Sequence, residues 1–137
     1  MVKNFVVSEY SLNPPEGGQG RVKITSGPLY DLARVQTLAR DENQLKAWTE
    51  KCRKDVLKWF DNDLERVGAL ILSLKPGDYI DSEWCENGKG SIAACDAYSI
   101  SVMEMAPATG RPVRMAYFLK FAVGKTGALV LIVSCHA

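Results

Sequence analysis

Long apolar runs are absent from this sequence, and their absence argues against a membrane protein. The longest run covers residues 128–133, far fewer than the roughly 20 residues that cross a bilayer. The apolar residues 5–7 are too few for the apolar region of a signal peptide. We therefore expect a cytoplasmic protein that does not associate with membranes.

The sequence motifs of the common enzyme classes are missing as well. There is no glycine-rich phosphate loop, no nucleophile elbow and no HExxH sequence. The cysteines form no CxxC pair and no secretory signal precedes them, so we expect free thiols. A zinc site has enough potential ligands in Cys85, Cys95, Cys135 and His136. Adjacent residues of a strand face opposite sides of the sheet, however, which disfavours joint binding of zinc by Cys135 and His136. We expect neither a metal nor a cofactor.

Acidic residues are absent from the C-terminal part of the chain. Residues 76–104 carry six acids and one base, whereas residues 105–137 carry four bases and no acid. A basic segment of this kind could contact phosphate groups, although four cations are also an ordinary number for solvated strands. Charge alone leaves both interpretations open.

The length of 137 residues suits one domain. Residues 1–27 include Pro14-Pro15 and several glycines, which predict an arm or long loop with short strands such as 22–25. We expect this arm to cover a sheet edge. Residues 28–137 then form a single α+β domain.

Helices are predicted in the first part of that domain. Apolar residues recur at three- and four-residue spacing over 28–40, 50–60 and about 63–74. Thr49 is suited to cap the second helix, and Asn62 or Asp63 the third. Residues 45–48 are ambiguous and fit a short strand.

Strands are predicted in the second part. Alternating residues over 78–85 and 93–102 flank an Asn-Gly turn, and residues 117–123 and 128–134 flank a Gly-Lys-Thr-Gly turn. Helices followed by hairpins indicate an α+β fold, in which N-terminal helices pack on one face of a C-terminal antiparallel sheet of four or more strands.

The C-terminal hairpin carries the residues best suited to chemistry. His136 is the only histidine, and histidine is the side chain that titrates near neutral pH. Strand alternation places His136 on one face with Ser134 and Ile132, and places Lys120 on one face with Phe118. Such a face can bind a phosphodiester and move protons without a metal, and RNA supplies its own nucleophile, the ribose 2′-hydroxyl.

Several segments, in this order and with similar gaps, resemble the MqsR family of toxin–antitoxin mRNA interferases, small relatives of the RelE fold. They are Leu74-x3-Asp78-Tyr79-x2-Ser82, Asp96-Ala97-Tyr98, Phe118-Leu119-Lys120 and Leu131-Ile132-Val133-Ser134. Together with the upstream helix that begins Pro28-Leu29-Tyr30-Asp31-Leu32, the resemblance covers residues 28–137. It implies a cytoplasmic α+β ribonuclease that uses no metal, cleaves mRNA and is held inactive by a cognate antitoxin protein.

At the positions usually assigned to catalysis in that family, this chain has different residues. Asp81 stands in place of a lysine, Cys95 in place of a glutamine, Phe118 in place of a tyrosine and His136 in place of a lysine. Either the site has been rebuilt on the same fold, or the activity has been lost.

In that register, we hypothesise that His136 transfers the proton, that Lys120 or Arg114 holds the scissile phosphate and that Phe118 stacks a base. A carboxylate at Asp81 repels phosphate unless it pairs with a base or orients the imidazole.

Two tyrosines complete the candidate set. Tyr117 adjoins Phe118 but points the other way, and Tyr98 matches the family motif while suiting a structural hydrogen bond equally well. The alternative function is a non-catalytic interaction module of the same fold, which binds a partner protein through an exposed sheet edge.

Overall fold

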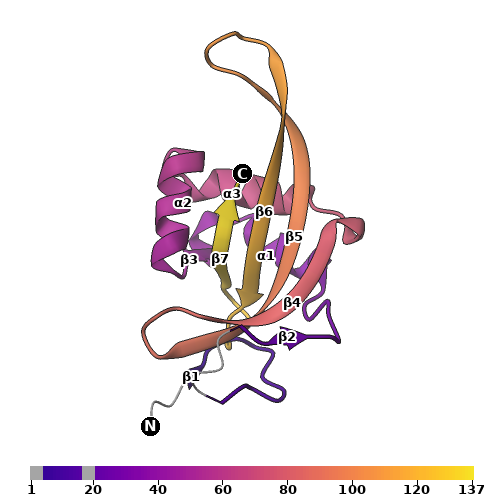
Figure 1. The fold of residues 1–137 in the computed structure, drawn as a ribbon, viewed down its shortest axis with the longest axis vertical. Coiled ribbons are helices and arrows are strands. Elements are labelled where there is room, and N and C mark those ends of the chain that lie inside the picture. Colours follow the sequence, from indigo (N-terminus) through magenta and orange to yellow (C-terminus); the bar gives the residue numbers. More distant parts are fainter. Residues whose placement is uncertain (1–4, 17–20) are drawn as a thin grey trace.

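The computed structural model describes residues 5–16 and 21–137, and it places the helices on one face of a curved sheet (Figure 1). The helices are α1 (Leu32–Ala39), α2 (Glu50–Phe60) and α3 (Leu64–Ser73). The strands are β1 (Phe5–Val6), β2 (Lys23–Ile24), β3 (Leu45–Ala47), β4 (Tyr79–Glu86), β5 (Ser91–Met105), β6 (Pro112–Val123) and β7 (Val130–His136). Two short 3-10 helices, η1 (Glu42–Gln44) and η2 (Pro76–Asp78), precede β3 and β4. None of the helices in the described part of the chain is long and apolar enough to cross a membrane.

The sheet has seven strands in the order β2-β4-β5-β6-β7-β3, and β1 pairs with β5 off this path. Its central pairs β4–β5, β5–β6 and β6–β7 are antiparallel, whereas β3–β7 and β1–β5 are parallel. The predicted α+β class, with helices preceding a mostly antiparallel sheet, is therefore confirmed. The parallel pairs were not predicted, because they join segments far apart in the sequence.

The N-terminal arm covers the sheet edge, as expected. Lys23 and Ile24 pair antiparallel with Glu83 and Ser82 of β4. Residues 1–4 and 17–20 of the arm lie outside the described residues. The arm is thus joined to the sheet by backbone hydrogen bonds along the edge of β4 that does not pair with β5.

The first helix begins later than its apolar spacing predicts. The backbone N–H groups of Leu29 and Tyr30 donate to the carboxylate of Asp96, at 3.0 and 3.1 Å. These bonds hold the chain before Leu32 against β5, so the prediction of a helix from residue 28 was wrong at its start. The caps of the later helices are confirmed, since Thr49 accepts from Cys52 N–H and Asp63 from Glu65 N–H, each at 2.9 Å.

The two faces of the sheet differ in what covers them. One face carries Tyr98, Leu119 and Phe121, all buried in the main core together with side chains of the three helices. The other face, which we call the outer face, lies away from the helices (Figure 1). Cross-strand pairing assigns these residues to it: Asp81, Glu83, Ala97, Ser99, Ser101, Arg114, Phe118, Lys120, Ser134 and His136.

A β-bulge changes the face of one residue in β7. Lys120 pairs with Ser134, but the next residue, Phe121, pairs with Ile132, so Val133 is the extra residue. Ile132 therefore faces the helices and is fully buried, and its predicted placement beside Ser134 and His136 was wrong.

The β5–β6 hairpin extends beyond its neighbours. Pairing of β5 with β4 ends at Tyr98, and pairing of β6 with β7 ends at Phe118. Past these residues the two strands continue as a two-stranded ribbon, visible as the long projection in Figure 1. Residues 99–105 of β5 pair with β6 on one side. On their other side they pair with no strand in the described ranges, so this side is a free strand edge.

Candidate functional site

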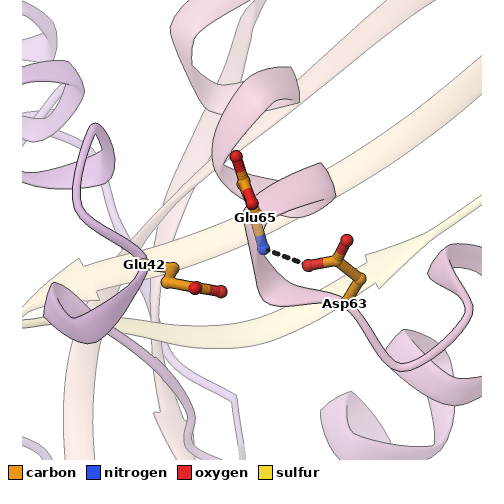
Figure 2. A group of neighbouring side chains, drawn as sticks. All are labelled: Glu42, Asp63 and Glu65. Carbon is orange, nitrogen blue, oxygen red and sulfur yellow. Dashed lines mark hydrogen bonds between the residues drawn. The ribbon is translucent and has the colours of Figure 1, made fainter.

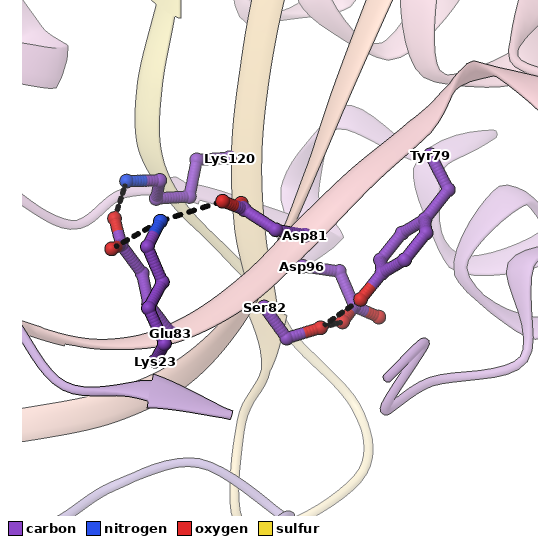
Figure 3. A network of polar contacts seen from close by, with 7 residues as sticks. All are labelled: Lys23, Tyr79, Asp81, Ser82, Glu83, Asp96 and Lys120. Carbon is purple, nitrogen blue, oxygen red and sulfur yellow. Dashed lines mark hydrogen bonds and ion pairs between the residues drawn. The ribbon is translucent and has the colours of Figure 1, made fainter. Parts of the chain in front are cut away.

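Four charged side chains on the outer face form one network, which we call the ion-pair cluster: Lys23, Asp81, Glu83 and Lys120 (Figure 3). Lys23 Nζ lies 2.6 Å from Asp81 Oδ2 and 3.1 Å from Glu83 Oε2. Lys120 Nζ donates to Glu83 Oε1. The side chains of Lys120 and Glu83 are only 6% and 4% exposed, so this pair lies inside the protein although it stands on the outer face.

The ion-pair cluster neutralises Lys120. Burial pushes the pKa of Glu83 upward, but hydrogen bonds from Lys120 and Lys23 outweigh burial and leave the pKa of Glu83 lowered. Glu83 is thus held as a carboxylate whose negative charge offsets the ammonium of Lys120. A lysine in this state attracts a phosphate far less than a free lysine does.

Asp81 does not orient the histidine, one of the roles considered for it from sequence. Its row across the sheet runs through Ala97 and Lys120 to Ser134, with Asp81 three strands away from β7. Three inter-strand spacings amount to about 14 Å. The Asp81 carboxylate instead accepts a hydrogen bond from Lys23 of the arm. Pairing with a basic side chain was the other role considered for Asp81 from the sequence.

A second group on the outer face joins Phe118 and His136, which we call the stacked pair. The two residues are directly opposite each other on β6 and β7. Their ring centroids are 5.3 Å apart with an interplanar angle of 28°, and both side chains are half-buried. Ser99 of β5 lies opposite Phe118 on its other side, so one row across the sheet reads Ser99, Phe118, His136.

Both candidate tyrosines lie on the helix face, away from the stacked pair. The Tyr117 hydroxyl donates to the Glu104 carboxylate at 2.6 Å, and burial together with this bond raises the pKa of Tyr117 to about 12. Tyr98 stacks on Phe121 at 5.4 Å, and burial, assisted by the charge of Asp96, raises its pKa to about 12. The structure thus places neither side chain with the other candidate residues.

Asp96 holds the start of the domain to β5 rather than serving chemistry. Its carboxylate accepts from the hydroxyl of Ser82 at 2.6 Å, and the Ser82 hydroxyl is 2.6 Å from that of Tyr79 (Figure 3). Burial raises the pKa of Asp96, and the hydrogen bonds from Ser82, Leu29 and Tyr30 oppose that rise. Asp96 therefore has a structural role in this fold.

A polar pocket lies along the free edge of β5, and we call it the edge pocket. Its volume is about 470 Å³, and its lining residues are Ser73, Lys75, Asp78, Ser99, Ile100, Ser101, Val102 and Arg114. Arg114 was predicted from sequence as a phosphate contact. Lys75 was not, because it lies in the connection after α3, where no periodic pattern marks a side chain as part of a surface.

The cysteines do not gather around His136. Cys135 faces the helices, where its sulfur is 3.8 Å from that of Cys52, whereas His136 lies on the outer face. The contact with Cys52 and burial raise the pKa of Cys135. Cys85 and Cys95 are buried near the other end of the sheet, on β4 and β5. The residues considered for zinc therefore do not converge.

One group of carboxylates lies at the surface away from the sheet: Glu42, Asp63 and Glu65 (Figure 2). Asp63 accepts the N–H of Glu65 as the cap of α3, and Glu65 lies in the first turn. Acidic side chains at these positions stabilise the N-terminus of a helix. Helix capping accounts for two of the three groups, and we assign no site to them.

Comparisons of the chain with protein-family models, with curated proteins and with solved structures find no match.

Proposed function

We propose that this chain is a metal-independent endoribonuclease that cleaves mRNA, the toxin of a toxin–antitoxin pair, with a cognate antitoxin protein as its partner. The observation that carries the proposal is the stacked pair on the outer face, which combines an aromatic ring with the only imidazole of the chain. An aromatic ring on a sheet binds unpaired bases by stacking. An imidazole transfers protons near neutral pH.

The proposed reaction is a transesterification that needs no added reactant. The ribose 2′-oxygen attacks the adjacent phosphorus, and the bond from phosphorus to the 5′-oxygen breaks. The imidazole of His136 accepts the 2′-hydroxyl proton and returns it to the departing 5′-oxygen. The products are a 2′,3′-cyclic phosphate and a 5′-hydroxyl end. Phe118 holds a base next to the imidazole and thereby positions the ribose.

The charged residues take different parts in this scheme. Lys120 Nζ is 5.6 Å from the centroid of the Phe118 ring, but its ion pair with Glu83 assigns it to holding β4 and β6 in place. Arg114 is four residues along β6 from Phe118, about 13 Å at strand spacing. It therefore suits a phosphate next to the scissile one rather than the scissile phosphate itself.

The proposal is tested with purified protein and single-stranded RNA in the presence of EDTA. Wild-type protein is expected to cleave, and His136→Gln to slow cleavage by about 10²- to 10⁴-fold, the usual contribution of a general acid–base group. Lys125→Ala, an exposed substitution in the β6–β7 turn, serves as a folded control with full activity. Intact RNA after incubation with folded wild-type protein, or full-rate cleavage by His136→Gln, would contradict the proposal.

A second candidate function has its own supporting observation. The unpaired edge of β5 over residues 99–105, with Met103 and Met105 exposed, can accept an additional strand from another protein. The chain would then be a non-catalytic interaction module. Protein that leaves RNA intact yet binds one partner tightly, and loses that partner when proline replaces Ser101, would favour this function over the nuclease.

A further inference from the structure

The edge pocket contains two cations, Lys75 and Arg114, that form no ion pair within the described part of the chain. Neither Lys75 nor Arg114 has a carboxylate within ion-pair distance among residues 5–16 and 21–137. The one acid lining the pocket is Asp78, whose Oδ2 accepts the backbone N–H of Lys75 at 2.8 Å. The lining therefore has a net positive charge of about one.

Hydroxyl and backbone groups accompany these cations. Ser99 and Ser101 are exposed and make no side-chain hydrogen bond within the described residues, whereas Ser73 donates to Ala69. The edge of β5 also offers unpaired backbone N–H groups at alternate residues. Cations, free hydroxyls and backbone N–H groups are the donors that bind phosphate oxygens in protein–nucleic acid complexes.

The edge pocket adjoins the stacked pair through Ser99. Ser99 lines the pocket and also lies opposite Phe118, which in turn lies opposite His136. From His136 to Ser99 is two inter-strand spacings, about 10 Å. Neighbouring nucleotides of a single strand can therefore occupy the stacked pair and the pocket together.

We propose that the edge pocket is a phosphate subsite for single-stranded RNA, in which Lys75 and Arg114 bind the backbone of nucleotides flanking those on the stacked pair. The RNA strand runs across the sheet, from β7 over β6 to the free edge of β5. Duplex RNA does not fit this path. Its bases are paired and stacked on one another, so none of them is free to stack on the Phe118 ring. An acidic peptide would meet the same cations, but it would make no use of the adjacent aromatic ring and imidazole.

This inference rests on the proposed RNA substrate but not on cleavage, and the test keeps the two apart. Binding of a fluorescent oligonucleotide with 2′-deoxyribose throughout, which cannot be cleaved, is measured by anisotropy over a range of salt concentrations. For each lost phosphate contact, the slope of log Kd against log salt is expected to fall by about 0.7. Lys75→Ala and Arg114→Ala should each lose one such contact, and Lys75→Arg should keep it.

Matched variants separate the subsite from the chemistry. Lys125→Ala removes an equal charge from the opposite end of β6 and should leave the slope unchanged. His136→Gln should slow cleavage of RNA by about 10²- to 10⁴-fold while keeping the salt slope of the wild type. Because Lys75 and Arg114 are exposed, both alanine variants are expected to fold, and Lys75→Glu provides a stronger perturbation of the same site.

The outcomes are distinguishable. If wild-type protein does not cleave RNA but Lys75→Ala and Arg114→Ala still lower the slope, the phosphate subsite stands and the nuclease function falls. If cleavage depends on His136 but neither variant changes affinity or slope, the subsite is overturned. Direct binding of fluorescent poly-glutamate that depends on Lys75 and Arg114, together with no measurable oligonucleotide binding, would assign the pocket to an acidic peptide and also overturn the inference.

Discussion

Two regions of the molecule contain similar side chains in different electrostatic states: the ion-pair cluster on the outer face, and the stacked pair with the edge pocket beside it. In the ion-pair cluster, two lysines meet two carboxylates, and the central pair Lys120–Glu83 is almost fully buried. Around the stacked pair and the edge pocket, the cations Lys75 and Arg114 have no acid partner in the described residues. The first region holds strands together, and the second leaves charge free for a ligand. A basic residue on a sheet is thus informative about function only once its partners are known.

The largest expected effect concerns the buried pair. Lys120→Ala leaves the Glu83 carboxylate buried with only Lys23 as partner, and breaking a buried pair in this way costs about 3–5 kcal/mol of unfolding free energy. Urea denaturation measures the change. Lys125→Ala, with its side chain in solvent, should stay within about 0.5 kcal/mol of wild type. Equal unfolding free energies of Lys120→Ala and Lys125→Ala would show that the ion-pair cluster does not stabilise the fold, contrary to the structural role assigned to it.

A double substitution tests whether Lys120 and Glu83 stabilise the protein as a pair. Replacing both partners, as in Glu83→Gln with Lys120→Met, removes the charges together and leaves no isolated buried charge. The double variant should therefore be less destabilised than the sum of the two single variants, with a coupling of about 1–3 kcal/mol. Additive losses would mean that the two side chains do not depend on each other. The same cycle with Arg114→Met in place of Lys120→Met should show no coupling.

These predictions depend on contacts that the sequence could not supply. Alternation correctly placed Lys120 on the face of Phe118, because both lie in one strand. The partner Glu83 is 37 residues away. It lies on β4, two strands from Lys120 and diagonal to it, and this position depends on the registers of the β4–β5 and β5–β6 pairs, which no local sequence pattern predicts. Local signals did succeed elsewhere, as in the Thr49 cap and the turns that join the hairpins.

Two errors share a cause in tertiary structure. The bulge at Val133 moved Ile132 to the helix face, and Asp96 drew the backbone of Leu29 and Tyr30 away from a helix. Both depend on what neighbouring segments offer rather than on the residues themselves. Phe118, Lys120, His136 and Arg114 were named as candidates from the sequence. The involvement of Lys75 and the ion pair of Lys120 with Glu83 were not predicted, because both depend on which distant segments lie side by side.

A smaller effect is expected from pH. The pKa of Glu83 is lowered in the folded protein, so its stabilising contribution is complete above the ordinary glutamate pKa of about 4.3 and is lost as pH falls through the folded value. Unfolding free energies measured between pH 6 and pH 3 should fall more steeply for wild type than for Glu83→Gln. Parallel pH curves would show that Glu83 is not held as a charged partner. The raised pKa of Asp96 acts in the opposite direction, but it is common to both proteins.

The smallest effect separates the two faces of the sheet. Tyr117→Phe loses one hydrogen bond to Glu104 and should cost about 1 kcal/mol of stability. Because Tyr117 faces the helices, RNA cleavage by this variant should match wild type. Phe118→Leu, one residue along the strand, should keep the fold but weaken oligonucleotide binding, since base stacking on an aromatic ring contributes about 1–3 kcal/mol. Loss of cleavage in Tyr117→Phe would place the site on the other face.

The most direct test of the difference between the two regions is a nuclear magnetic resonance titration with the 2′-deoxy oligonucleotide. Ring signals of Phe118 and His136, and the amide signals of Ser99 and Lys75, are predicted to shift as the oligonucleotide saturates. Side-chain signals of Asp81 and Glu83 should stay in place, whereas those of Lys120 lie near the Phe118 ring and do not serve as a reference. Shifts confined to the ion-pair cluster, or none at saturating concentration, would contradict the account.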